Sequence, residues 1–202
     1  INKSPKGGLF VTSGLGGMSG AQPKAGNIAG CITVCAEVNP KITKIRHDQK
    51  WVDEIYENIN ELVNRVKVAK EKKETISLAF LGNVVEVWEK FATENLTIDI
   101  GSDQTSLHNP WAGGYYPAGF SLEESNKMMA EEPARFKQEV QKTLVRHINA
   151  VNAFAAKGMY FFDYGNAFLL EAGRAGADIY KTEKPIKGGH VGATFRYNSY
   201  VQ

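Results

Sequence analysis

Continuous apolar runs of strand length, separated by segments of helical periodicity, constrain the fold of this chain more than any other feature. Residues 31–38 read CITVCAEV and residues 76–82 read ISLAFLG, without the alternation of a half-exposed strand. Such runs are typical of strands that are covered on both faces, as in a parallel sheet. Further strands are expected over residues 8–14, 51–57 and 159–166, the last being the final strand, and residues 97–106 are expected to be a strand that runs into a polar loop. The sequence therefore predicts an α/β fold, a doubly wound and mostly parallel sheet with helices on both faces.

Segments of helical periodicity lie between these strands. The longest begins near Pro133 and ends at Gly158, with apolar residues along one face. The segment 107–121 is irregular, and the polar tail from Ala177 is assigned no element. Helices are expected over residues 23–30, 58–74, 83–95, 131–158 and 167–176, with a short one after Pro40 and one that opens with the capping box SLEE at 121–124.

Composition narrows the class of protein. The chain has 202 residues, which suits one domain with a substantial core. A net charge of +2 is too small to indicate nucleic acid or an anionic membrane as a partner, and no apolar stretch is long enough to span a bilayer. Cys31 and Cys35 share one face of a strand, too far apart to bridge, so we expect reduced, buried thiols in a reducing, cytoplasmic compartment. Because the chain begins with Ile1 rather than methionine, we expect a segment of a longer protein.

The glycine-rich stretch GLGGMSGAQ, residues 14–22, follows the first predicted strand directly. A strand, a glycine loop and a helix form the arrangement in which backbone N–H groups bind the pyrophosphate of a dinucleotide. The strict pattern G-x-G-x-x-G is not met, because Ser19 stands at the third glycine position and Gly20 follows it. Glu37 ends the next strand about 20 residues on, where an acid binds the ribose hydroxyls and favours NAD over NADP. A glycine-rich turn followed by a chance glutamate is the alternative.

Polar residues also follow the other predicted strands. They occur in LGN (81–83), SDQTSLH (102–108) and DYGN (163–166). Each could be a helix cap or turn by itself, but the carboxyl ends of parallel strands share one edge of the sheet, where ligands bind. The four histidines are scattered without metal-ligand spacing, so no metal site is expected. Ser106 and His108 are too close in sequence to be assigned as nucleophile and base.

The motifs VTSGLGGMSGAQPKA, AEV, LGN, GSDQTSLHNP, GGYYPAGFS and DYGNAFLLEAGRAGAD together resemble the urocanase family, in particular its eukaryote-like branch. The resemblance covers nearly the whole chain and implies that residues 1–202 are a single Rossmann-like NAD-binding domain, inserted in the core domain of a homodimer. The family adds water to urocanate to give imidazolonepropionate in histidine degradation, with NAD⁺ as an electrophile. A conventional NAD-dependent dehydrogenase domain and a non-catalytic nucleotide-binding module are the alternatives.

The resemblance also implies the residues that contact NAD. Ser19 and Val84 stand where glycine and alanine are common in the family, and Ile42 stands where an arginine is usual. Whether Arg46 replaces that arginine is left open. With the glycine loop included, the expected contacts are Gly16, Gly17, Met18, Ser19, Gly20, Glu37, Asn83, Val84, Gln104, Thr105, Ser106, Leu107, His108, Tyr115, Tyr116 and Tyr164.

The resemblance implies that functional residues are divided between this segment and the rest of the protein, which leads to two further expectations. Its reactive cysteine and main substrate residues lie outside this segment, and Cys31 and Cys35 do not match that cysteine's motif, so no catalytic residue is assigned here. The segment alone is then expected to be inactive on urocanate and to bind NAD⁺ weakly. Insertion in a core domain predicts that Ile1 and Gln202 lie close together.

Overall fold

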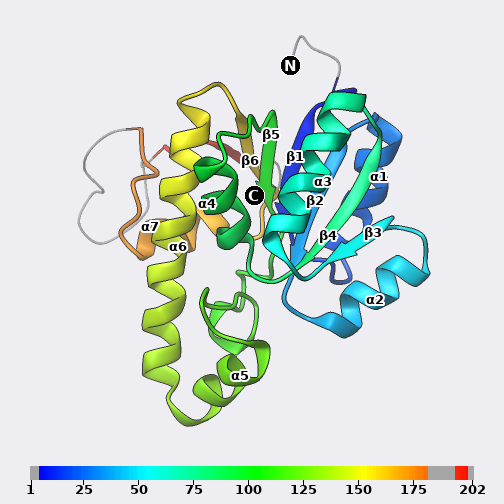
Figure 1. Ribbon diagram of the computed structural model, residues 1–202. Helices are drawn as coiled ribbons and strands as arrows, with labels where there is room; N and C mark the ends of the chain where they lie inside the picture. Colours follow the sequence, from blue (N-terminus) through cyan, green and yellow to red (C-terminus); the bar gives the residue numbers. More distant parts are fainter. Residues whose placement is uncertain (1–4, 182–193, 200–202) are drawn as a thin grey trace.

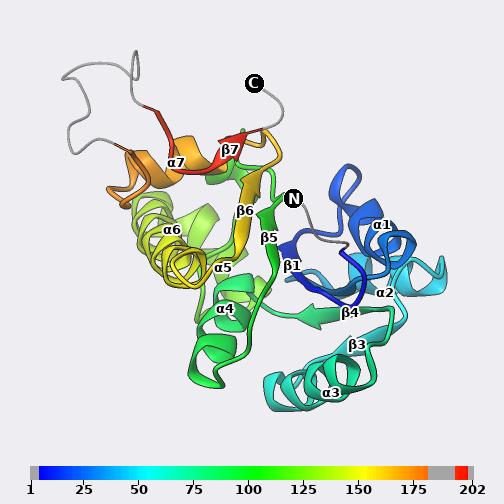
Figure 2. The same ribbon diagram turned by 90° about the horizontal axis from the view of Figure 1, so that it is seen from above.

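A parallel sheet with helices on both faces forms the fold, which is the predicted α/β class (Figures 1 and 2). The computed structural model describes residues 5–181 and 194–199. The strands within these ranges are β1 (Leu9–Ser13), β2 (Ile32–Glu37), β3 (Glu54–Tyr56), β4 (Ile76–Leu81), β5 (Ile100–Asp103), β6 (Tyr160–Asp163) and β7 (Asn198–Ser199). The helices are α1 (Gln22–Ala29), α2 (Pro40–Asp48), α3 (Ile59–Lys72), α4 (Val84–Thr93), α5 (Leu122–Glu131), α6 (Pro133–Ala155) and α7 (Phe168–Arg174), with 3₁₀ turns η1 (Ser19–Ala21) and η2 (Pro110–Ala112).

The strand order is β3-β4-β2-β1-β5-β6-β7, and every pairing between these strands is parallel. The first four strands lie on one side, in the spatial order β1, β2, β4 and β3, and the chain then returns to place β5 on the other side of β1. The direction of winding therefore reverses at β1. In open α/β sheets, such a reversal opens a crevice beyond the carboxyl ends of the strands, which is where ligands bind.

Three sequence predictions about strands need correction. The strand expected over 51–57 is confined to β3, because the chain at Trp51 still bonds back to α2, its N–H donating to the Arg46 carbonyl at 2.9 Å. The strand expected within 97–106 begins only at Ile100 and, as β5, is followed by the expected polar loop after Asp103. Nor is β6 the last strand, since β7 pairs with it in parallel; two polar residues carry no apolar pattern that sequence could reveal. The predicted proximity of Ile1 and Gln202 lies outside the described residues.

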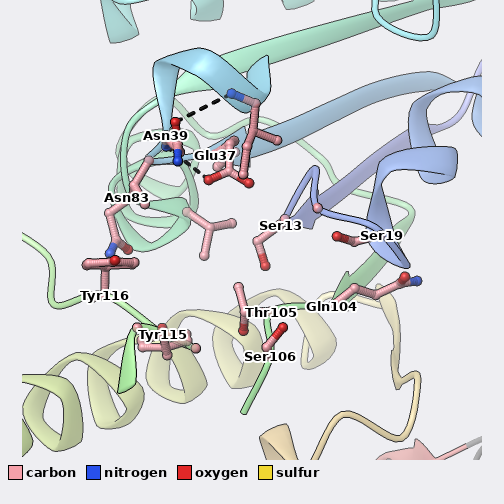
Figure 3. Close-up of a pocket in the computed structure, with 18 of the residues that line it drawn as sticks. Ser13, Ser19, Glu37, Asn39, Asn83, Gln104, Thr105, Ser106, Tyr115 and Tyr116 are labelled. Atoms are coloured by element: carbon pink, nitrogen blue, oxygen red, sulfur yellow. Dashed lines mark hydrogen bonds between the residues drawn. The ribbon is translucent and has the colours of Figure 1, made fainter. Parts of the chain in front are cut away.

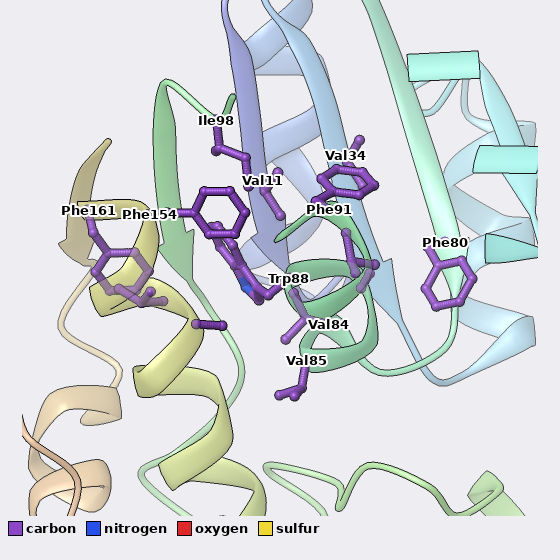
Figure 4. Packing of buried hydrophobic residues seen from close by; sticks show 14 of the residues in the cluster. Val11, Val34, Phe80, Val84, Val85, Trp88, Phe91, Ile98, Phe154 and Phe161 are labelled. Carbon is purple, nitrogen blue, oxygen red and sulfur yellow. The ribbon is translucent and has the colours of Figure 1, made fainter. Parts of the chain in front are cut away.

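The two faces of the sheet are packed differently. On one face, Trp88 of α4 is fully buried, with its ring centroid 5.7 Å from that of Phe154 and 6.4 Å from that of Phe161 (Figure 4). On the other, α1 lies so close to β2 that a Cβ at Gly26 would be 1.9 Å from the Thr33 hydroxyl. A large aromatic core therefore fills one face, whereas the small residues of α1 allow close approach on the other.

Cys31 and Cys35 are free thiols and both are buried, as predicted. Cys35 packs with Leu15, Val52 and Ala79 in a small cluster that is separate from the large core. Burial raises the pKa of the Cys35 thiol well above its usual value, so it stays protonated. It therefore behaves as a core side chain rather than as a nucleophile.

Helix α5 and the first half of α6 extend beyond the carboxyl edge of the sheet (Figure 1). A complete capping box begins α5, in which Ser121 accepts from the Glu124 amide and the Glu124 carboxylate accepts from the Ser121 amide. The irregular segment between β5 and α5 runs along the same edge, so it can contribute to a site there. Over the described ranges, none of the helices is both long and apolar enough to cross a bilayer.

Candidate functional site

A cavity of about 230 Å³ lies at the carboxyl edge of the sheet (Figure 3). Its walls come from the segments that follow β1, β2, β4 and β5, and from the irregular segment before α5. Glu37 and Gln104 face this same cavity although they end different strands. Ten of the sequence-predicted residues line it: Gly16, Ser19, Glu37, Asn83, Val84, Gln104, Thr105, Ser106, Tyr115 and Tyr116.

Six predicted residues are not among the described residues that line this cavity. Met18 is 79% exposed at the tip of the glycine loop, and Gly17 beside it is also exposed. Leu107 is buried in the large core, and His108 is exposed after it. The remaining two are Gly20, which is buried in η1, and Tyr164, which is 43% exposed just after β6. Their assignment as cofactor contacts stays a prediction.

Glycine stands at positions 14 and 17 of the loop for different structural reasons. Gly14 has φ +86°, and a Cβ there would lie 2.9 Å from the Ser19 hydroxyl oxygen and 3.1 Å from the Gln104 carbonyl oxygen. A side chain is therefore excluded both by the backbone conformation and by its neighbours. A Cβ built at Gly17 would have no neighbour within 4 Å among the described residues, so the backbone there is bare and accessible.

The helix that follows the glycine loop begins without the side-chain cap seen on its neighbours. Asn39, Asn58 and Asn83 each accept from backbone N–H groups in the first turn of α2, α3 and α4. Met18 and Ala21, which stand at the N-caps of η1 and α1, have no side-chain oxygen that could do the same. The Gly20 N–H donates to the Gly16 carbonyl at 2.9 Å and the Gln22 N–H donates to the Ser19 carbonyl, so an anion at this helix start would bind the N–H groups that precede Gly20.

Glu37 links the end of β2 to the glycine loop. One carboxylate oxygen accepts from the Leu15 N–H at 2.8 Å and the other from the Asn39 N–H at 2.9 Å. The carboxylate is thus fixed at the cavity wall, and each oxygen keeps a second lone pair for a further donor.

The opposite wall contains Asn83, Tyr115 and Tyr116. The Asn83 side chain accepts from the Val85 N–H at 3.0 Å and donates to the Tyr116 carbonyl at 2.8 Å. Asn83 is therefore the N-cap of α4 and also an anchor for the irregular segment. Asn83 thus caps a helix and also lines the cavity, and its contact with a cofactor stays a prediction.

Tyr115 connects the cavity to the core through His147 of α6. The Tyr115 hydroxyl and His147 Nδ1 lie 3.0 Å apart, and both side chains are buried. Burial lowers the pKa of His147 to about 3 and raises that of Tyr115 well above its usual value. Both groups are neutral at physiological pH, so this pair presents a rigid, uncharged wall.

Beneath the cavity, the buried carboxylate of Asp103 joins three strand ends. It accepts from the Ser13 hydroxyl, from the Thr105 N–H at 3.1 Å and hydroxyl at 2.6 Å, and from the Asn166 amide at 2.9 Å. Burial raises its pKa, and these hydrogen bonds oppose that effect. Its partner in register on β6 is Asp163, whose pKa burial also raises. Asp103 therefore fixes the segments after β1, β5 and β6 relative to one another.

Sequence reasoning missed several residues of the site. Ser13, Asn39 and Ile42 also line the cavity and were not among the expected contacts, although Ser13 lies in the first family motif and Ile42 stands at the position of the family's arginine. The position of Ser13 at a strand end and the Asn-Pro pair at 39–40 were the available signals. Arg46 is not among the described residues that line the cavity. Within the described ranges, no group of three or more His, Cys, Asp and Glu side chains is placed to hold a metal ion.

Comparison with known proteins places these features in a family. A family model described as the urocanase Rossmann-like domain matches residues 1–202. A probable urocanate hydratase of Dictyostelium discoideum is 57% identical over 197 residues, which cover 97% of this chain and 28% of that protein. The urocanate hydratase of Homo sapiens is 50% identical over 202 residues, covering 97% and 29%. The chain thus spans under a third of the length of these curated relatives.

Among solved structures, a short-chain dehydrogenase/reductase from Serratia marcescens is similar with a TM-score of 0.40 and 13% sequence identity. The similarity covers 81% of this chain and 57% of that one.

Proposed function

The chain belongs to the urocanase family, and on that premise we propose that it is the domain that holds NAD⁺ in a urocanate hydratase. The observation that carries the proposal is the cavity at the carboxyl edge, which gathers ten of the sixteen cofactor contacts expected from the sequence. The alternative of a conventional dehydrogenase domain has no observation in its favour.

The residues present fit NAD⁺. The bare backbone at Gly17 and the start of η1, which has no side-chain cap, suit a pyrophosphate. Glu37, fixed at the end of β2, suits ribose hydroxyls, and its charge disfavours the 2′-phosphate of NADP. The neutral Tyr115 and the amide of Asn83 form a polar but uncharged opposite wall, and Gln104 lies beside the glycine loop near Ser19 (Figure 3).

When bound, NAD⁺ would supply a nicotinamide ring that acts as an electrophile toward urocanate. The role of this chain is to bind and orient that ring and to exclude water from part of it. A cavity of about 230 Å³ lies below the roughly 300–1,000 Å³ typical of small-molecule sites. We infer that the rest of the protein completes the enclosure and supplies the reactive cysteine, as the domain insertion implied by the family requires.

Three further features follow from the same proposal. Urocanate is the substrate of the intact enzyme, a hydro-lyase of histidine degradation that forms a homodimer. Residues 1–202 form a single inserted domain. Buried free thiols at Cys31 and Cys35 support a reducing compartment such as the cytoplasm.

The first test is the affinity of the full-length protein for NAD⁺. We expect Glu37→Ala to weaken binding by about 1–3 kcal/mol, because a charged hydrogen bond to the ribose is lost. Titration calorimetry measures the change, and Glu71→Ala, an exposed glutamate of α3, is the matched control. Equal affinity of the two variants would remove Glu37 from the site.

A second measurement concerns the division of labour. Residues 1–202 mixed with urocanate and NAD⁺ are expected to leave the urocanate absorbance unchanged. Loss of absorbance above background would place the chemistry in this segment. Formation of NADH with an oxidisable substrate would favour the dehydrogenase alternative instead.

A further inference from the structure

Arg46 of α2 reaches across to the glycine loop and binds its backbone. Its Nε donates to the Leu15 carbonyl at 2.8 Å, and Nη2 donates to the Gly16 carbonyl at 2.7 Å. The third nitrogen, Nη1, donates to the Gln49 side chain at 2.8 Å. All three nitrogens of the guanidinium are therefore used within the protein.

The surroundings hold this guanidinium in place. It lies 4.9 Å from the ring centroid of Trp51, and Lys24 of α1 lies over the same ring at 5.6 Å. A Cβ at Gly20 would lie 2.2 Å from Arg46 Nε. A side chain at position 20 would therefore collide with Arg46, so the arginine explains this glycine, which was assigned to the cofactor from the sequence.

Leu15 is held from both directions. Its N–H donates to Glu37, its carbonyl accepts from Arg46, and its side chain is fully buried. In a planar trans peptide, the C=O and the N–H of the next residue point in opposite directions. Because the carbonyls of Leu15 and Gly16 point to Arg46, the N–H groups of Gly16 and Gly17 point away from it. Gly16 lines the cavity whereas Arg46 does not, among the described residues.

We propose that Arg46 is a positioning residue, which turns the N–H groups of Gly16 and Gly17 toward the pyrophosphate of the cofactor without touching it. Its charge also neutralises two carbonyl oxygens that would otherwise repel a phosphate. The identity of the ligand rests on the proposed function, whereas the orientation of the loop does not. Arg46 is then a fixed part of the loop and leaves the NAD-over-NADP preference to Glu37.

The first experiment measures amide hydrogen exchange in residues 14–20 of the protein without NAD⁺. Arg46→Met removes the hydrogen bonds, and Arg46→Lys keeps the charge but not the planar fork. Both variants are expected to speed exchange in this loop by about tenfold or more, whereas Arg135→Met, an exposed arginine of α6, leaves it unchanged. Unchanged exchange in both Arg46 variants would overturn the proposal.

The second experiment titrates the same variants with NAD⁺. The dissociation constant of both variants for NAD⁺ is expected to rise by about tenfold or more, because the N–H groups of Gly16 and Gly17 are no longer held in place. If Arg46→Lys binds NAD⁺ like the wild type and its loop exchange is unchanged, then only the positive charge of residue 46 matters, through its attraction to the ligand, and the proposal fails. If the wild type does not bind NAD⁺, the proposed function fails, while the exchange data still decide the loop orientation.

A double-mutant cycle separates this contact from general loss of folding. Gly20→Ala should speed loop exchange in the wild type by displacing Arg46, but should add less than about twofold in the Arg46→Met background. Equal effects of Gly20→Ala in both backgrounds would show that the two residues act independently, which contradicts the proposal.

Discussion

The two walls of the cavity are held in place by different kinds of interaction. The glycine wall, residues 14–20, is bare backbone that Glu37 and Arg46 hold through its amide and carbonyl groups. The aromatic wall, residues 113–116, is fixed by burial of Tyr115 against His147 and by the bond from Asn83 to the Tyr116 carbonyl. One wall therefore depends on a few polar anchors, and the other is continuous with the core.

This difference predicts different consequences of mutation. Loss of an anchor of the glycine wall should loosen a loop, which changes binding more than global stability. Loss of a contact in the aromatic wall should lower the stability of the whole domain, because Tyr115 belongs to the large core cluster. Asp103 bonds both to Ser13, just before the glycine wall, and to Thr105, at the start of the segment that leads to the aromatic wall.

The largest effect is expected from removing the Asp103 carboxylate, which links the two walls. Asp103→Ala leaves the Ser13, Thr105 and Asn166 donors buried without an acceptor, so we expect the free energy of unfolding to fall by about 3 kcal/mol. Chemical denaturation measures the change. Asp48→Ala, at an exposed aspartate of α2, should change stability by less than about 0.5 kcal/mol. Similar values for the two variants would mean that the strand ends are fixed by other contacts.

A smaller effect distinguishes the two tyrosines of the aromatic wall. Tyr115→Phe leaves His147 Nδ1 buried without its partner and should lower the free energy of unfolding by about 2 kcal/mol. The Tyr116 hydroxyl bonds to Asn126 in an exposed position, so Tyr116→Phe should change stability by less than about 0.5 kcal/mol. Denaturation of both variants side by side tests this, and a reversed order would contradict the assignment of Tyr115 to the core.

The smallest effect is a dependence on pH that comes from His147, the partner of Tyr115 in the aromatic wall. Burial lowers the pKa of His147 to about 3, whereas an unfolded histidine has a pKa of 6.5. Between these values the unfolded state binds more protons, so this contribution to stability is present above pH 6.5 and is lost as the pH falls. At pH 5.5 the loss is about 1.4 kcal/mol.

Comparison of the wild type with His147→Asn isolates this contribution. The free energy of unfolding is measured at pH 8 and pH 5.5, and the wild type should lose about 1.4 kcal/mol more than the variant. Asp103 and Asp163, whose raised pKa values act in the opposite direction, are present in both proteins and cancel in the difference. The same pH dependence in both proteins would contradict a neutral, buried His147.

Sequence reasoning was most successful where the signal is local. The apolar run 31–38 predicted a strand buried on both faces, and the edge rule for parallel sheets brought Glu37 and Gln104 to one cavity. The aromatic wall was predicted only through resemblance to a family, since no periodicity marks the segment 107–121. The contact between Gly20 and Arg46, and the pair of Tyr115 with His147, join residues 26 and 32 positions apart. Nothing in the local pattern of either partner specifies such a contact.

The strand order also has a consequence for the chain while a ribosome is making it. Strands β1, β2, β3 and β4 all precede β5 in the chain and pair with one another, so this half of the sheet and the glycine wall can form before β5 is synthesised. During that interval, β1 lies at the border of an incomplete sheet, with backbone groups open to pairing with another nascent chain. Emergence of Ile100–Asp103 covers that border with β5. The topology that creates a crevice in the finished protein thus leaves β1 temporarily unprotected in the growing one.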